Sequence, residues 1–175
     1  MIDKRNRKAL LLWRAGKLER ASSYFKKLIF NDLVSRENKT LAEYMLAYLY
    51  NQIAYQQHDA LCVIGINLNH PYVDPYFEAG RYLATLSDLN FNPADYDLPL
   101  FESVSLAKIA SSHPRASIVI LSSPYLRKQL SATAINLIEE ISPRVRQPNH
   151  SAQAYDSLAP LTLMQGARNG NALSC

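Results

Sequence analysis

Residues 40–55 read TLAEYMLAYLYNQIAY, and this stretch decides the fold because its apolar and aromatic side chains fall on most faces of a helix. A helix that is apolar on most sides is typical of the centre of a domain, where neighbours pack on it from several directions. Thr40 and Glu43 match the capping box, which predicts that the helix begins at Thr40. We therefore expect a mostly α domain built around this helix.

The residues before this stretch also predict helices, separated by a glycine. An apolar stripe recurs there at helical spacing. Gly16 interrupts the helical pattern, and such a glycine predicts a turn between two helices. The stripe comprises Leu18, Ala21, Phe25, Leu28 and Ile29.

Beyond residue 57, a capping residue followed by proline predicts further helix starts. Asp74-Pro75 predicts a helix to about Leu89, and Ser123-Pro124 predicts one that continues through Ile138 and stops near Pro143. A short helix is expected between them, from Ser105 to Ser111.

Residues 117–121, Ser-Ile-Val-Ile-Leu, favour a strand because they are rich in β-branched side chains between turn signals. The expected fold class is thus mostly α, with at most one short strand or strand pair near 117–122. We expect residues 1–142 to form a single helical domain. Residues 143–175, which turn to Pro, Gln, Asn, Ser, Ala and Gly, are expected to form a flexible C-terminal tail.

Charge is sorted into three blocks along the chain. The basic head, residues 1–40, holds 11 of the 19 Lys and Arg residues against 4 of the 15 acids. The acidic middle, residues 41–104, holds eight acids and one base, and residues 105–175 hold seven bases and three acids. This sorting predicts that the head binds a polyanion and that the acidic middle binds either a basic partner or the head itself. Chance drift is the alternative, because like-charge runs are usually solvated faces.

No enzyme signature is present in the sequence. It contains no Gly-rich phosphate loop, no Gly-x-Ser-x-Gly elbow and no CxxC, and its four histidines have no partner at metal-ligand spacing. We therefore expect no catalytic residue, cofactor or metal. No run approaches the roughly 20 apolar residues that span a bilayer, which favours a cytoplasmic protein with no membrane partner. The histidines are His58, His70, His113 and His150.

The cations of the basic head, interleaved with Trp13 and Tyr24, have the composition of a nucleic-acid contact surface. Arg127 and Lys128 fall in the first turn of the helix predicted after Ser123-Pro124, where the helix dipole disfavours cations, which indicates placement for a ligand or simple solvation. An acidic protein partner or a second copy of the chain is the competing interpretation for the head. The candidate nucleic-acid-binding residues are Arg5, Arg7, Lys8, Arg14, Lys17, Arg20, Lys26, Lys27, Arg127 and Lys128.

Residues 10–30 resemble the second half of a tetratricopeptide repeat. Gly16, Ala21, Phe25 and Leu28 match the family's turn glycine, helix-crossing alanine and apolar positions. The repeat period of about 34 residues has no convincing second copy here. The resemblance implies a helical adaptor or chaperone that binds a peptide in a groove lined by Tyr44, Tyr48 and Tyr55.

Residues 89–131 are similar to the FlhD subunit of the bacterial flagellar master regulator and to small regulators of mobile elements. The similarity lies in a turn at Leu89-Asn-Phe-Asn92, the stretch Leu98-Pro-Leu-Phe101, a short helix at residues 105–110, a short strand at 118–121 and a following helix with the run Arg127-Lys-Gln-Leu130. It implies a helical transcriptional regulator that binds DNA as a dimer or with a partner subunit. The two interpretations are thus a nucleic-acid-associated regulatory subunit and, as the alternative, a protein-binding adaptor; a viral or plasmid structural role also stays open.

Overall fold

The computed structural model describes the backbone of residues 1–64 and 74–142, and their side chains apart from those of residues 57–64. Every regular element in these ranges is helical, so the prediction of a mostly α fold is confirmed. The predicted tail at 143–175 lies outside the described residues. The elements are α1 (Lys4–Arg14), α2 (Leu18–Ile29), α3 (Arg36–Ile64), α4 (Pro75–Ala84), the 3-10 helix η1 (Pro93–Tyr96), α5 (Ser103–Ser112), α6 (Pro114–Ser122), α7 (Pro124–Arg127) and α8 (Ala132–Ile141).

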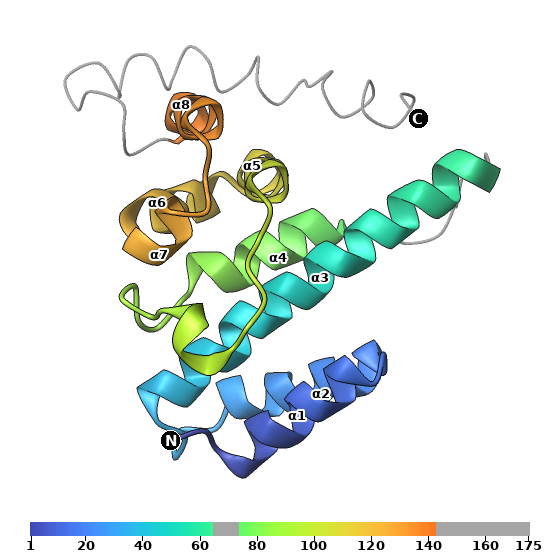
Figure 1. Cartoon of the computed structure of the whole chain (residues 1–175), viewed down its shortest axis with the longest axis vertical. Helices are drawn as coiled ribbons and strands as arrows, with labels where there is room; N and C mark the ends of the chain where they lie inside the picture. The colour runs from blue at the N-terminus through green and yellow to red at the C-terminus, as the bar shows by residue number, and fades with distance from the viewer. Residues whose placement is uncertain (65–73, 143–175) are drawn as a thin grey trace.

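The long helix α3 is the axis of the fold, and the other helices cover it from two sides (Figure 1). The α1–α2 hairpin packs on one side of α3, and α4 lies along the other, with α5, α6 and α8 beyond α4. Every side chain from Leu41 to Ala47 is buried, which explains why this stretch is apolar on most faces. One cluster of buried apolar side chains includes residues from every helix between α1 and α8.

The α1–α2 hairpin forms where the sequence predicts it. Gly16 adopts a φ of 80°, a left-handed conformation that glycine reaches without steric cost, and this turn separates the two helices as expected. Within α2, Ala21, Phe25 and Leu28 are fully buried. The predicted stripe is therefore the face that packs on α1 and α3.

Helix α3 begins at Arg36, so the prediction of a helix start at Thr40 is wrong. Ser35 caps the helix instead, because its hydroxyl accepts a hydrogen bond from the backbone N–H of Asn38 at 3.2 Å. Thr40 lies inside the helix and donates to the carbonyl of Arg36 at 2.8 Å. Glu43 accepts from the N–H and hydroxyl of Ser87, at 2.9 and 3.0 Å, and so joins α3 to the chain after α4.

Helix α4 begins as predicted, with the Asp74 side chain accepting from the backbone N–H of Tyr76 at 3.0 Å. It ends at Ala84, five residues before the expected Leu89, because the N–H of Ser87 is bound by Glu43 and not by the helix. Gly80 lies against the start of α6, where a Cβ atom would overlap the Cβ of His113. This glycine allows α4 to approach its neighbours closely.

Residues 117–121 form part of α6, so the predicted strand is wrong. Pro114 occupies the first turn of this helix, and Ala116, Ser117 and Ile120 are its buried residues, which is helical spacing. The described residues contain no strand with which this segment could pair. Packing against α4 and α5 therefore outweighs the preference of Ile118 and Val119 for extended backbone.

The helix predicted from Ser123-Pro124 to Pro143 is interrupted, and α7 and α8 are separate. Ser131 breaks the run because its hydroxyl accepts from the N–H of Ala134 at 3.1 Å and caps α8. Its own backbone N–H donates to the hydroxyl of Ser103 at 2.9 Å, which ties the break to the start of α5. The expected helix at Ser105–Ser111 is present as α5, slightly longer at both ends.

Candidate functional site

The hairpin cations differ in exposure, and two of them, Arg5 and Lys26, are partly buried and engaged in contacts within the protein. The Arg5 guanidinium pairs with the Asp3 carboxylate at 3.2 Å. Lys26 is half-buried and donates to the Tyr50 hydroxyl of α3 at 2.8 Å, a hydrogen bond that is the main cause of its raised pKa. Both side chains therefore stabilise the hairpin rather than extend its outer surface.

Two of the remaining cations, Lys8 and Lys27, lie over the ring of Tyr24, and the charge of Arg20 also acts on its hydroxyl. These residues are here called the Tyr24 cluster: Lys8, Arg20, Tyr24 and Lys27. The ammonium groups of Lys8, from α1, and Lys27, from α2, lie 5.1 and 5.5 Å from the centre of the Tyr24 ring. A hydrogen bond from Lys8 and the charges of Lys8, Lys27 and Arg20 lower the pKa of the Tyr24 hydroxyl. The cluster is thus a site of positive potential on the surface.

Carboxylates do not offset this charge. Within residues 1–64 and 74–142, no ion pair joins Lys8, Arg20 or Lys27 to a carboxylate. The predicted residues Arg7, Arg14 and Lys17 are exposed as well, the last two beside the turn at Gly16. Most of the predicted hairpin cations therefore share one exposed, basic element.

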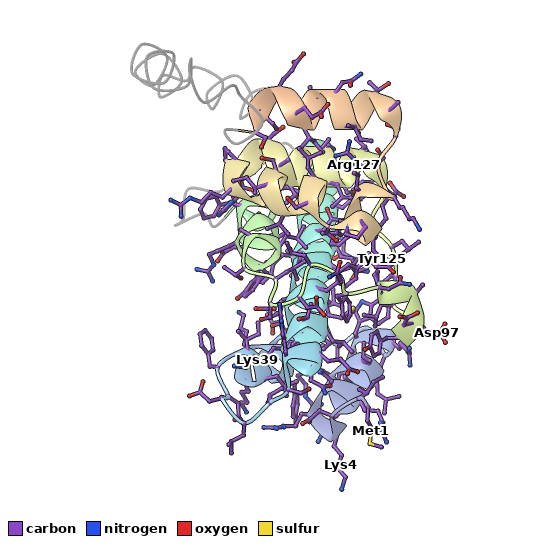
Figure 2. All side chains as sticks on the ribbon, turned by 90° about the vertical axis from the view of Figure 1, so that its left-hand side faces the viewer. Met1, Lys4, Lys39, Asp97, Tyr125 and Arg127 are labelled. Atoms are coloured by element: carbon purple, nitrogen blue, oxygen red, sulfur yellow. The ribbon has the colours of Figure 1, made fainter. Side chains whose placement is uncertain are left out.

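Arg127 and Lys128 do not belong to this surface. Figure 2 shows Arg127 at the opposite end of the molecule from Met1 and Lys4. Arg127 is the last residue of the four-residue helix α7 and Lys128 is its C-cap, so the expectation that both lie in the first turn of a long helix is wrong. The two cations are therefore not at an unfavourable end of a long helix dipole, and the dipole gives no reason to expect a ligand there.

The three predicted partner-binding tyrosines occupy different environments. Tyr44 is only 1% exposed, and its hydroxyl donates to the carbonyl of Pro99 at 2.7 Å. Its ring packs against Phe91 and Phe101, with ring centres 5.8 and 5.3 Å apart. Tyr44 is therefore a core residue, and the expectation that it lines a groove is wrong.

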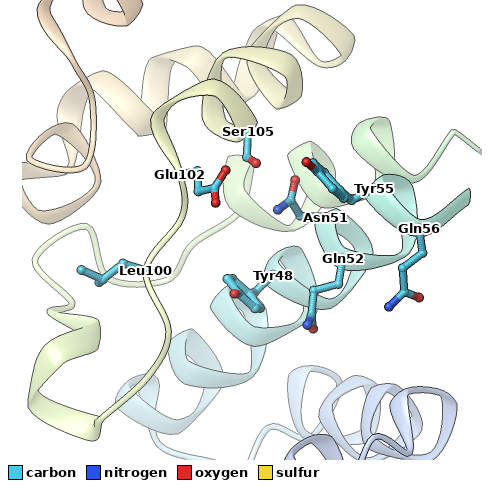
Figure 3. A pocket seen from close by; sticks show the side chains of 8 residues that line it. All are labelled: Tyr48, Asn51, Gln52, Tyr55, Gln56, Leu100, Glu102 and Ser105. Carbon is cyan, nitrogen blue, oxygen red and sulfur yellow. The ribbon is translucent and has the colours of Figure 1, made fainter. Parts of the chain in front are cut away.

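Tyr48 and Tyr55 do lie beside a surface depression, here called the α3–α5 pocket. It has a volume of about 300 Å³ between α3 and the start of α5 (Figure 3). The lining is mainly polar, with one carboxylate and no cation among the described residues. Its residues are Tyr48, Asn51, Gln52, Tyr55, Gln56, Leu100, Glu102 and Ser105.

Sequence reasoning missed most of this pocket. Tyr48, Gln52 and Gln56 follow each other at intervals of four residues, so a shared helical face was detectable from spacing alone. Glu102 and Ser105 belong to the α5 region and reach the pocket only through tertiary packing, for which no local signal exists.

No group of His, Cys, Asp and Glu suited to a metal ion occurs among the residues that the structure describes. Of the four histidines, only His113 has a described side chain; it lies between α5 and α6, with its ring centre 4.8 Å from that of Phe77. In the described ranges, no helix combines the length and apolar character needed to cross a bilayer.

No protein-family model, curated protein or solved structure significantly matches the chain. The resemblances to FlhD and to a tetratricopeptide hairpin therefore stay predictions.

Proposed function

We propose that the protein binds duplex DNA through the outer face of the α1–α2 hairpin, as the nucleic-acid-associated subunit of a regulator. The observation that carries this proposal is the Tyr24 cluster, in which Lys8 and Lys27 lie over one aromatic ring, the charge of Arg20 acts on its hydroxyl, and no described carboxylate pairs with the three cations. Like charges held close together repel each other, and phosphate groups that bind among them relieve this repulsion and release counterions.

The aromatic ring adds to the electrostatic argument. The half-buried Tyr24 ring, which packs on the core beside these cations, offers its accessible part to a sugar or base, while the flanking lysines contact phosphates. The exposed Arg14 and Lys17 extend the positive charge towards the hairpin turn. Because contacts of this kind recognise the phosphate backbone, the proposed binding has little dependence on base sequence.

The regulatory part of the proposal rests on the similarity of residues 89–131 to FlhD. In this scheme the protein acts in the bacterial cytoplasm, as a dimer or with a partner subunit. Phosphate contacts are confined to the hairpin, because Arg127 lies at the far end of the molecule (Figure 2).

Fluorescence anisotropy of a labelled random-sequence duplex tests the proposal. The full chain is compared with a triple variant of the Tyr24 cluster, Lys8→Glu, Arg20→Glu and Lys27→Glu. A matched control, Arg115→Glu, Arg127→Glu and Lys128→Glu, changes the net charge equally at exposed positions of α6 and α7. We expect the cluster variant to lose about tenfold or more in affinity and to reduce the slope of log K against log salt by about three.

The control variant separates a local surface from a general effect of charge. If both variants lose affinity equally, binding follows net charge alone and the hairpin surface is not the site. If the unmodified chain does not bind at low salt, direct DNA contact by this chain is excluded.

A protein-binding adaptor is the second candidate, favoured by the α3–α5 pocket with its exposed Tyr55 and half-buried Tyr48. An adaptor complex at this pocket involves one carboxylate, Glu102, so its affinity falls only slightly as salt rises, whereas a DNA complex that neutralises several phosphates weakens steeply. The same salt titration, performed with a captured protein partner, therefore distinguishes the two functions.

A further inference from the structure

The α3–α5 pocket is lined by polar side chains, two aromatic rings and one carboxylate. Glu102 places a carboxylate at its edge, and the rings of Tyr48 and Tyr55 form two of its sides (Figure 3). No lysine or arginine lines the pocket among the described residues. A cation that enters it would therefore meet a negative charge and two aromatic faces.

Asn51 supplies an independent sign of a missing donor. Its side chain is 9% exposed, and its Oδ1 atom has no hydrogen-bond donor among the described residues. A buried acceptor without a partner costs about 1 to 3 kcal/mol, so a ligand that donates to it recovers this cost. Figure 3 shows Asn51 on α3 beside Tyr55, with Ser105 and Glu102 across from it on the α5 segment. The Oδ1 atom itself is buried, so a donor reaches it only when neighbouring side chains shift.

The electrostatics of the pocket agree with this arrangement. Burial and the nearby charge of Glu102 raise the pKa of the Tyr48 hydroxyl, so Tyr48 stays neutral and its ring stays available to a cation. Ligand sites in proteins typically start at about 300 Å³, so a pocket of this volume suits one side chain or a small molecule rather than a folded element.

We propose that the α3–α5 pocket binds a guanidinium group, presented by an arginine side chain. A guanidinium is planar and carries five N–H donors, which allows it to pair with the Glu102 carboxylate, donate to Asn51 Oδ1 and stack on a tyrosine ring together. An ammonium group lacks the planar fork that pairs with both carboxylate oxygens and stacks on a ring, so we expect it to bind more weakly. This site is separate from the Tyr24 cluster, and its occupation does not depend on DNA binding.

Nuclear magnetic resonance titration of the full chain with N-acetyl-arginine amide tests the proposal. The citrulline analogue is the matched control, because it has nearly the same shape and no charge. We expect saturable amide shifts centred on residues 48–56 and 102–105 with the arginine probe, weaker shifts with the lysine analogue, and none with citrulline.

Two variants test the roles of the named groups. Glu102→Gln removes the carboxylate from an exposed position whose side chain forms no capping bond, so folding is preserved, and we expect at least tenfold weaker binding. Asn51→Asp places a second carboxylate in the pocket and is expected to strengthen binding of the arginine probe. Glu19→Gln makes the same charge change as Glu102→Gln on exposed α2 and is expected to leave binding unchanged.

Three results would overturn the proposal: equal binding of arginine and citrulline probes, undiminished binding by Glu102→Gln, or shifts that map to other residues. Shifts at the pocket with the lysine probe as strong as with arginine would contradict the guanidinium assignment. Because DNA binding is measured separately on the hairpin variants, failure here leaves the proposed function untouched.

Discussion

The two sides of α3 are held by different kinds of contact. On the hairpin side, polar side chains join the elements: Asn38 of α3 accepts from the backbone N–H of Asp3 at 2.8 Å and donates to the carbonyl of Met1 at 3.0 Å. On the other side, α4 meets the start of α6 at Gly80, where the two segments lie so close that a methyl group does not fit. The difference teaches that the hairpin contact adds directional bonds to its apolar packing, whereas the α4–α6 contact depends on close packing.

The largest effect is expected for Gly80→Ala, which breaks the close contact between α4 and α6. The added methyl group overlaps His113 Cβ, an atom that cannot rotate away, and lies 3.3 Å from Ile109 Cγ2. We expect a loss of about 3 kcal/mol in the free energy of unfolding, measured by urea denaturation with circular dichroism.

Gly16→Ala is the matched control on the hairpin side. No atom lies within 4 Å of the added methyl group, and the cost of about 1 kcal/mol arises from the left-handed backbone alone. Equal losses for the two glycine variants would show that packing does not distinguish the two sides.

The next largest effect is expected for Asn38→Ala, which tests the hydrogen bonds between α3 and the N-terminal residues before α1. Asn38→Ala removes a buried side chain that also accepts from Asn6 Nδ2 at 3.0 Å, and it leaves several backbone groups without partners. We expect a loss of about 2 kcal/mol by the same denaturation measurement, with early loss of hydrogen-exchange protection in α1. Asn136→Ala, at an exposed position of α8, should leave stability unchanged. Unaltered protection of α1 in Asn38→Ala would contradict the role given to these bonds.

Tyr44→Phe addresses the core that both sides share. It removes the hydrogen bond to Pro99 while the aromatic contacts with Phe91 and Phe101 stay in place. We expect a loss of about 1 kcal/mol in the free energy of unfolding, because the Pro99 carbonyl is left without this donor. Tyr55→Phe, whose parent ring is 53% exposed, should change stability little. A loss as large for Tyr55→Phe would argue against the burial of Tyr44 as the cause.

The smallest effect is a pH dependence of the free energy of unfolding that arises from His113, at the α4–α6 contact. Burial is the main cause that lowers the pKa of His113 below its ordinary 6.5, and the charges of Arg115 and Arg81 lower it further, against an opposing contribution from Glu78. The unfolded chain therefore takes up this proton at a higher pH than the folded chain does. Stability falls as the pH drops below about 6.5, and the loss is complete below the folded pKa.

His113→Gln should remove this component of the pH dependence, which denaturation curves at neutral and mildly acidic pH would detect. The hairpin residues should contribute nothing to it, because His113 lies between α5 and α6. If His113→Gln loses as much stability at mildly acidic pH as the parent chain does, groups other than His113 cause that loss.

Much of the helical framework was predictable because its signals are local. Gly16 marks the hairpin turn, and Asp74 with Pro75 marks the start of α4, since each acts through its own backbone. The burial of α2 along Ala21, Phe25 and Leu28 follows from spacing alone.

The wrong predictions share a dependence on distant residues. Thr40 and Glu43 have the pattern of a capping box, but Glu43 binds Ser87, which lies 44 positions away. The β-branched residues of α6 lie in a helix because α4 and α5 pack on it. Ser131 ends a helical pattern through its bond with Ser103. For the candidate sites, the cations were evident from composition, and Arg20, Tyr24 and Lys27 share a face of α2 by spacing alone, whereas the approach of Lys8 to Tyr24 required the packing of α1 on α2.

Trp13 is the chain's single tryptophan, and it joins the hairpin to the central helix. Its indole N–H donates to Gln52 Oε1 at 2.9 Å, and its ring meets that of Tyr48 edge-on at 6.0 Å. The protein thus contains a built-in fluorophore at the junction of α1 and α3. Its emission should move to longer wavelength when the hairpin leaves α3, and it should not respond to rearrangements confined to α6–α8. Detachment of the hairpin can therefore be followed optically, without any attached dye.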